Sequence, residues 1–347
     1  MAQSASPIIA APALREFVAA LLVAAGFDPG HARTCAEVLV WADLRGQGPH
    51  GVARAPSYID MPRRGVLDPA ARIEVEVIRP GVARVNAHRA LGPAALARAA
   101  EVAAERARAA GTAWVFVQDH GHGGAIGYYA RQVAEQGMLA IMLTASRPMM
   151  AYHGSTGPVL ATSPLAVAVP GGGLLDMSTA AIAMGKIAAA KSEGRVLPAG
   201  VAVDRDGNAT TDAAVAVTPL PLGGAKGSGL ALMIEALTSV ALANPLLASA
   251  LRDPAQMEDY RLNSALVALD LEVLGGRDVF ARGFAELSAA VKAQPRAPGV
   301  DELLLPGERG DRESARRAAA GVPVAAATWA RLCELAQRYA VPLPPQA

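Results

Sequence analysis

Apolar residues recur at helical spacing near both ends of the chain, whereas in the middle they alternate or run together. The first helix is predicted over residues 12–25 and ends at Gly26. Its apolar face consists of Leu14, Phe17, Val18, Leu21 and Leu22. Asp28 and Pro29 then predict an N-cap and a first helical residue, and this second helix extends to Asp43. A third, short helix follows His50, and we expect residues 1–10 to be disordered.

The pattern changes after residue 72. Residues 73–78 and 82–87 are rich in β-branched side chains and flank Pro80-Gly81, which predicts a hairpin. Further strands are expected at 113–117, 138–144, 159–160, 165–169 and 263–271, and helices at 91–110, 125–136, 278–293, 311–320 and 325–340. Residues 221–229 open another expected helix, which runs to about residue 243. An alanine-rich helix is also expected after Thr179, through Lys186. The predicted fold class is α+β (mixed α/β), with helical parts at 1–72 and 301–347 around a sheet part at 73–300.

Composition limits the partners and the compartment. The chain is 52% hydrophobic, so it can bury a substantial core, and its net charge of +1 gives no reason to expect nucleic acid or an anionic membrane as a partner. Cys35 and Cys333 are far apart in the sequence, and we expect free thiols. Because we find neither a secretory signal nor an apolar run long enough to span a membrane, we expect a cytoplasmic protein.

The richest stretch for chemistry is the glycine-rich segment from Asp43 to Arg54. Histidine transfers protons near neutral pH, and glycines on both sides of His50 allow a ligand to approach the backbone. If a helix starts at His50, Arg54 lies one turn later on the same face. A proton donor beside a guanidinium suits a small carboxylate substrate. The alternative interpretation is a helix-connecting turn with a surface histidine.

A second histidine-bearing loop follows the predicted strand at 113–117. His120 and His122 are two residues apart, so on a strand they would share one face and could bind a metal. A third ligand would have to come from His153 or a carboxylate. A hydrogen-bonding role for His122 toward a substrate or cofactor is the other interpretation, and we favour it.

Three more loops are rich in glycine. Gly171-Gly172-Gly173 favours a hairpin but also lets a ligand approach the backbone. Residues 223–229 place Lys226 and free N–H groups at a helix start, where phosphate binds, although the spacing is not that of a Walker A motif. Residues 307–310 suit a surface turn before a helix. No GxGxxG fingerprint follows an early strand, so the sequence does not support a Rossmann site.

Together these loops resemble the type 2 malate/L-lactate dehydrogenase family. This family also includes ureidoglycolate, sulfolactate and diketogulonate oxidoreductases, and piperideine-2-carboxylate and pyrroline-2-carboxylate reductases. The resemblance extends from about Leu14 to Leu335. The matching segments are 43–54 (D-L-R-G-x-x-S-H-G-V-x-R), 122–129 (H-F-G-x-x-G-Y-Y), 161–164 (G-T-N-P), 176–179 with 185–186 (D-M-[AS]-T and G-K), 197–208 (L-P-x-G and D-x-D-G-N), 222–230 (L-G-G-x-K-G-x-G-L) and 305–308 (L-P-G-E).

The resemblance implies a non-Rossmann fold, in which a helical domain from both chain ends joins a sheet-based domain that binds NADPH or NADH. It implies a homodimer and hydride transfer between nicotinamide and C2 of a 2-hydroxy, 2-oxo or 2-imino acid. His50 is then the proton donor or acceptor, with Arg54, or else Arg45, as carboxylate clamp and His122 in the pocket. The implied cofactor-binding residues are Gly172, Gly173, Leu174, Leu175, Asp176, Met177, Ser178, Ala225, Lys226, Gly307, Glu308 and Arg309.

This chain departs from the family pattern at several positions. Pro49 replaces the serine before the histidine, Gly123 replaces an aromatic residue, and Ala145 and Ser163 replace asparagines. These changes suggest that the substrate is not malate or lactate but a bulkier acid or an imine. Asp119 and His120 are candidates for a new acid–base pair. Two alternatives stay open: a degenerate family member acting as a binding or structural dimer, and a metal-dependent enzyme using His120 and His122. The candidates for contact with a cofactor 2′-phosphate are Arg147, Lys186, Lys191 and Arg309.

Overall fold

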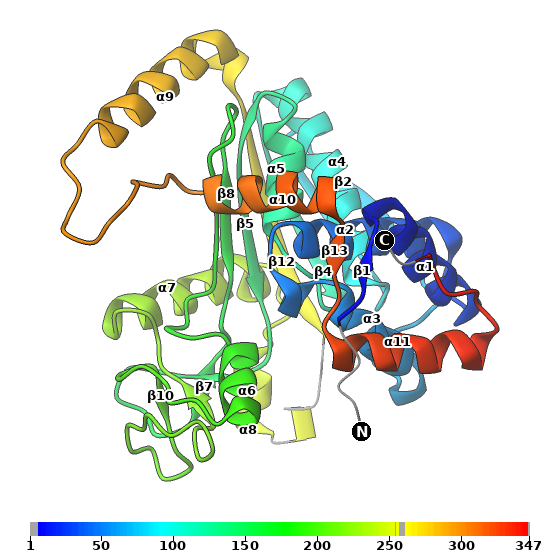
Figure 1. Cartoon of the computed structure of the whole chain (residues 1–347). Coiled ribbons are helices and arrows are strands. Elements are labelled where there is room, and N and C mark those ends of the chain that lie inside the picture. The colour runs from blue at the N-terminus through cyan, green and yellow to red at the C-terminus, as the bar shows by residue number, and fades with distance from the viewer. Residues whose placement is uncertain (1–5, 254, 257–260, 346–347) are drawn as a thin grey trace.

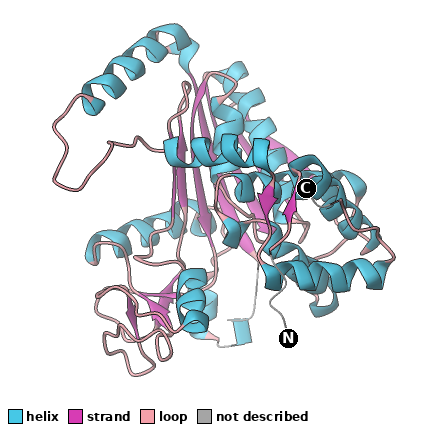
Figure 2. Cartoon of the chain, in the orientation of Figure 1, coloured by secondary structure: helices cyan, strands magenta, loops and turns pink. Residues whose placement is uncertain are grey.

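The computed structural model describes residues 6–253, 255–256 and 261–345. A helical part, made from both ends of the chain, lies beside a part built on a β-sheet (Figure 1, Figure 2). The predicted mixture of helix and sheet is therefore confirmed. Within the described residues, no helix has both the length and the apolar character needed to cross a bilayer.

The helical part joins the N-terminal helices to the last helix of the chain, which lie together on the right of Figure 1. Its elements are α1 (Ala11–Ala24), α2 (Pro29–Leu44), α3 (Ala55–Asp60) and α11 (Ala326–Tyr339). Asp28 caps α2 by accepting hydrogen bonds from the N–H groups of Gly30 and His31, as the sequence predicts. The apolar faces of these helices share one core, which includes Leu14, Leu39 and Leu332.

The prediction that residues 1–10 are disordered is wrong in part. Residues 1–5 lie outside the described residues, but Ile8–Ile9 form strand β1, which pairs with β13 (Val322–Pro323). The two ends of the chain are thus joined by backbone hydrogen bonds as well as by the shared core. The division into parts at 1–72, 73–300 and 301–347 stays a prediction.

The central sheet has seven strands in the order β2-β3-β4-β12-β5-β8-β9. All neighbours are antiparallel except β3 and β4. The strands are β2 (Glu74–Arg79), β3 (Val82–Asn86), β4 (Thr112–His120), β5 (Met138–Ala145), β8 (Leu165–Ala168), β9 (Leu174–Met177) and β12 (Leu262–Asp270). Helices α4 (Gly92–Ala110) and α5 (Gly127–Ala134) pack on this sheet through alanine-rich faces, which gives a largely aliphatic core.

The remaining elements extend from this framework. They are β6 (Met150–Ala151), β7 (Pro158–Leu160), α6 (Met184–Glu193), β10 (Ala202–Val203), β11 (Thr218–Pro219), α7 (Ala225–Glu235), the π-helical turn η4 (Ala236–Val240), α8 (Leu247–Arg252), η6 (Leu271–Val273), α9 (Arg277–Lys292) and α10 (Glu308–Ala320). In Figure 1, α9 projects from the body, and a long loop returns from it to α10. Lys292 at the end of α9 forms an ion pair with Glu308 at the start of α10.

The helix expected from Thr179 through Lys186 begins later in the chain than predicted. Residues 178–183 are not helical, and α6 begins only at Met184. Thr179 and Ala181 instead donate backbone hydrogen bonds to Thr162 and Leu220, which belong to neighbouring segments. These long-range bonds override the helix propensity of alanine, which is only a weak preference.

Candidate active site

A buried carboxylate closes the loop that follows α2, which we call the His50 loop (residues 43–54). Asp43, in the last turn of α2, accepts a hydrogen bond from the Val52 N–H at 2.7 Å, across the short 3-10 helices η1 (Gly48–His50) and η2 (Val52–Arg54). A Cβ on Gly51 would lie 2.1 Å from Asp43 Oδ1, so only glycine fits there. Burial raises the pKa of Asp43 to about 7.

His50 has the surroundings of a proton-transfer group. Its Nδ1 is buried without a hydrogen-bond partner among the described residues. Burial, and then the charge of Arg54, lower the pKa of His50 to about 4, so the imidazole is neutral near pH 7. Arg54 is held beside it because its Nε donates to the Pro49 carbonyl at 2.7 Å. His50 and Arg54 lie close together, as predicted, but they lie on two short 3-10 helices and not on one α-helix.

The structure brings His122 to His50 across the two parts of the molecule. Their rings stack with centroids 5.8 Å apart and planes 3° from parallel. The His122 Nδ1 lies 2.7 Å from the Tyr58 hydroxyl and also accepts the Gly124 N–H at 3.2 Å. A backbone N–H can only donate, so Nδ1 carries the lone pair and the proton is on Nε2. Burial, followed by the charges of Arg54 and His50, holds the pKa of His122 well below its usual range.

His120 does not share a face with His122, so that expectation is wrong. The strand β4 ends at His120, whose ring is fully buried. The Nδ1 of His120 lies 2.6 Å from the Gly121 carbonyl oxygen, and its Nε2 lies 2.8 Å from the Ser264 hydroxyl. No group of three or more metal-ligating side chains occurs in the described part of the chain. The pair of histidines therefore gives no support to a metal site.

The proposed pair of Asp119 and His120 is not present either. Asp119 has a positive φ of 55°, and its Oδ1 accepts hydrogen bonds from Asn244 at 2.9 Å and Arg261 at 3.4 Å. Both nitrogens of His120 are within hydrogen-bonding distance of other groups. The hydrogen bonds of these two residues thus connect the end of β4 to neighbouring segments.

Arg45 is placed differently from Arg54. Its side chain is only 4% exposed, pairs with Asp311 through Nη1 and donates to the Gly307 carbonyl through Nη2 at 3.1 Å. Its guanidinium also lies over the ring of Trp41 at 4.9 Å. Because these contacts occupy both terminal nitrogens, the structure does not support Arg45 as the carboxylate clamp.

The segments predicted to bind the cofactor lie against one another. Leu174 donates its N–H to the Pro306 carbonyl at 3.1 Å, which places the turn at residues 172–174 beside Gly307. Leu222 donates to the Thr179 carbonyl at 2.8 Å, so the residues after β9 lie beside the start of α7. Asp176 accepts the Gly127 N–H at 3.1 Å and lies 3.5 Å from the Gln47 amide of the His50 loop. Residues 172–178 therefore lie beside the turn at Gly307 at one end and beside the residues before α7 at the other, and Asp176 links them to the His50 loop.

This grouping suits a dinucleotide. A Cβ on Gly172 would meet nothing within 4 Å, so the backbone is open to close approach there. Gly172, Gly223 and Gly224 all have a positive φ, which favours glycine. The helices α10 and α7 begin beside the two ends of the segment 172–178, where their N-terminal N–H groups attract anions. Lys226 and Arg309 stand exposed at these two helix starts.

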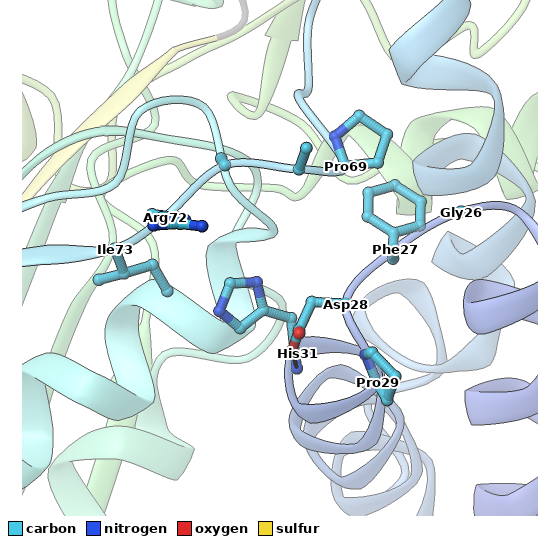
Figure 3. Close-up of a pocket in the computed structure, with 10 residues that line it drawn as sticks. Gly26, Phe27, Asp28, Pro29, His31, Pro69, Arg72 and Ile73 are labelled. Atoms are coloured by element: carbon cyan, nitrogen blue, oxygen red, sulfur yellow. Dashed lines mark hydrogen bonds between the residues drawn. The ribbon is translucent and has the colours of Figure 1, made fainter.

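A separate cavity of about 540 Å³ lies elsewhere, between the turn joining α1 to α2 and residues 69–73 (Figure 3). None of its ten lining residues belongs to the predicted site. The candidate active site is therefore defined by its side chains and backbone and not by this cavity.

The departures from the family pattern prove to be mostly internal. Ala145 and Ser163 are fully buried, and a Cβ on Gly123 would lie 2.4 Å from Leu96 Cδ1, so Leu96 already fills that direction. Pro49 is exposed, and its ring faces Gly185 at the start of α6. Of these four positions, Pro49 is the exposed one, and it directly precedes His50.

Two important residues were not identified from the sequence. Tyr58 orients His122, and Asp311 pairs with both Arg45 and Arg131. A signal for Tyr58 exists, because it follows Arg54 by four residues. Nothing in the local sequence around Asp311 connects it with Arg45.

Known proteins are similar to this sequence over nearly the whole chain. Residues 9–333 match the family model described as malate/L-lactate dehydrogenase. The malate/(S)-sulfolactate dehydrogenase of Methanothermus fervidus is 31% identical over 341 residues, covering 95% of this chain and 97% of that protein. The Delta(1)-pyrroline-2-carboxylate/Delta(1)-piperideine-2-carboxylate reductase of Pseudomonas syringae pv. tomato is 32% identical, covering 94% and 95%.

A solved structure agrees with these matches. The sulfolactate dehydrogenase from Methanocaldococcus jannaschii superimposes with a TM-score of 0.85 at 30% identity, covering 97% of this chain and 98% of that chain. Fold and sequence together define an oxidoreductase of the dehydrogenase and reductase class, which implies a nicotinamide cofactor. The chain belongs to the malate/L-lactate dehydrogenase family.

Proposed function

We propose that this enzyme transfers a hydride between a nicotinamide cofactor and C2 of a 2-oxo or 2-hydroxy acid or a cyclic 2-imino acid, with His50 as the proton donor or acceptor. The observation that carries the proposal is the buried Nδ1 of His50, beside Arg54, which has no hydrogen-bond partner in the part of the chain that the structure describes. A proton-transfer group needs a nitrogen that the protein leaves free for the substrate. The Arg54 guanidinium, anchored through Nε to the Pro49 carbonyl, directs its terminal N–H groups to a substrate carboxylate in this proposal.

His122 has a different role from His50 in this proposal. Its Nδ1 accepts from Tyr58 and Gly124, so its Nε2–H is fixed as a hydrogen-bond donor. A neutral imidazole with its one lone pair already used cannot take the substrate proton, but it can orient the substrate oxygen or nitrogen. The two stacked rings thus have separate roles, in which His50 transfers the proton and His122 orients the substrate.

Replacing Tyr58 with phenylalanine tests this division. We expect kcat/KM to fall about tenfold, because the shorter of the two contacts to His122 Nδ1 is lost while the ring still packs. In protein labelled with ¹⁵N-histidine, the wild-type His122 should give an unprotonated Nδ1 and a protonated Nε2. A wild-type spectrum with the proton on Nδ1 would contradict the assignment.

The cofactor supplies the hydride when it is bound. Residues 172–178, Ala225, Lys226 and 307–309 would hold it, with Lys226 and the first N–H groups of α7 near its phosphates. The hydrogen bonds and packing that link these segments to the His50 loop support this placement. Arg309 is the exposed basic residue of the 307–309 turn and a candidate for contact with a 2′-phosphate.

Titration of the purified protein with NADH and with NADPH, followed by nicotinamide fluorescence, is the experiment that tests this proposal. We expect saturable binding with a micromolar Kd for at least one of them, and the tighter one identifies the cofactor. The chosen cofactor is then used to screen 2-oxo acids and cyclic 2-imino acids for its oxidation. If neither nucleotide binds, the proposal fails and a non-catalytic binding or structural role takes its place.

The pKa of His50 gives a directional pH prediction. In the oxidative direction His50 must accept a proton, so kcat/KM should rise with pH through about 4 and then level off. In the reductive direction the free enzyme must carry that proton, so kcat/KM should fall about tenfold per pH unit above this pKa. Initial rates measured in both directions check this. A reductive kcat/KM that is constant from about pH 5 to about pH 8 would contradict the assigned role of His50.

The proposed assembly is a homodimer in the cytoplasm, without nucleic acid or membrane as a partner. Exposed apolar side chains on α7, η4 and α9, including Met233, Leu237 and Leu287, support an interface with a second copy of the chain. Sedimentation velocity should give a dimer mass, and a monomer at micromolar concentration would contradict it.

Pro49, facing α6 next to His50, supports a substrate other than malate or lactate.

A further inference from the structure

Arg45 connects the His50 loop to the turn that precedes α10. It is the first residue after α2, five residues before His50, and its side chain is 4% exposed. Its Nη2 donates to the Gly307 carbonyl at 3.1 Å, and its Nη1 pairs with Asp311. The same Gly307 carbonyl also accepts the first hydrogen bond of α10, from the Asp311 N–H at 2.9 Å. One guanidinium therefore holds both the carbonyl and the carboxylate of the first turn of α10.

The packing around Arg45 leaves no freedom for this side chain. Its guanidinium lies over Trp41, and a Cβ on Gly310 would lie 2.6 Å from its Nη2. A second contact reinforces the same junction, since Arg317 of α10 donates to the Asp43 carbonyl at 2.7 Å. The end of α2 is thus fixed to α10 at two points, by Arg45 at the first turn of α10 and by Arg317 near its C-terminal end.

The charges at this junction have a further consequence. Asp311 lies in the first turn of α10, where an uncompensated carboxylate would repel a phosphate approaching the helix start. Arg45 and Arg131 both pair with Asp311 and neutralise it. Only Arg45 of the two also contacts the Gly307 carbonyl.

We propose that Arg45 is a positioning residue that sets the distance and orientation between the His50 loop and the dinucleotide-binding turn at Gly307. This inference rests on the proposed function, because it assigns Gly307 to the cofactor site. Arg45 touches neither substrate nor cofactor. It orients the Gly307 peptide, and with it the N–H groups at the start of α10, while keeping them in register with His50.

The test compares Arg45→Met with Arg131→Met as a matched control. Both variants remove one of the two partners of Asp311, but only Arg45→Met removes the contact with Gly307. The readout is the Kd for NADH and for NADPH by nicotinamide fluorescence, with thermal unfolding measured in parallel. We expect the Kd of the cofactor to rise about tenfold in Arg45→Met and to stay within about twofold of wild type in Arg131→Met. At saturating cofactor, Arg45→Met should also lose kcat, because His50 is no longer held in register.

Gly310→Ala provides a second route if Arg45→Met does not fold. Its added Cβ displaces the Arg45 guanidinium while every charge at the junction is kept. We expect the cofactor Kd to rise severalfold. Equal Kd values in Arg45→Met and Arg131→Met, or an unchanged Kd in folded Arg45→Met or Gly310→Ala, would overturn the inference while leaving the proposed function intact. Failure of the wild-type protein to bind either nucleotide is a different result, because it would overturn the proposed function and this inference with it.

Discussion

Replacing His50 with alanine should lower turnover by at least two orders of magnitude in both directions. The loss follows from removal of the proton-transfer group, a contribution that is commonly about 10²- to 10⁴-fold. The fold of the His50 loop should survive, because Asp43 and the Pro49 carbonyl hold the loop while the His50 Nδ1 holds nothing among the described residues. The cofactor Kd should therefore stay within about twofold of wild type.

Two controls make this result specific to proton transfer. His88→Ala removes an exposed histidine whose side chain pairs with Glu74, which is not a residue of the candidate site, and should leave turnover unchanged. Added imidazole should restore part of the activity of His50→Ala, because it can occupy the space of the missing ring. Near-normal turnover in His50→Ala would remove His50 from the mechanism. A larger loss in His122→Ala than in His50→Ala, without imidazole rescue of the latter, would exchange the roles of the two rings.

Local sequence signals predicted the regular elements well where short-range forces decide them. The apolar spacing in α1 and α11, the Asp28-Pro29 cap of α2 and the Gly171–Gly173 turn between β8 and β9 all depend on residues close in sequence. The helix expected through Lys186 failed for the opposite reason. Its residues bond to strands and loops far away in sequence, and periodicity and alanine content do not report such partners.

The candidate site shows the same limit. The closeness of His50 and Arg54 could be predicted, because four residues separate them. The separate directions of His120 and His122 could not, because they depend on Gly121 ending the strand and on partners in α3 and β12. Arg45 is the clearest case: its guanidinium suits a carboxylate clamp, but its carboxylate partner is Asp311, 266 residues later.

Replacing Gly51 with alanine should have the second large effect, through the shape of the His50 loop. The added Cβ would lie 2.1 Å from Asp43 Oδ1 and 2.4 Å from Oδ2, a distance that no real Cβ tolerates. Gly51 has φ −90°, so the conflict is one of space and not of backbone strain. Asp43 is buried and cannot swing out to solvent, so the loop must move and His50 with it. We expect a loss of at least about two orders of magnitude in kcat/KM and a destabilisation of about 1–3 kcal/mol in urea unfolding.

Gly48→Ala is the matched control, because its Cβ would lie 3.8 Å from the same oxygen, an ordinary contact. That variant should keep most of its activity and stability. Asp43→Ala in the Gly51→Ala background removes the clash, so the double variant should be more stable than the sum of the two single changes predicts. It should not regain full activity, because Val52 then loses the acceptor that closes the loop. Equal behaviour of Gly51→Ala and Gly48→Ala would show that Asp43 does not shape the loop. Recovery of stability without recovery of turnover would show that Asp43 supports catalysis by holding His50 in place.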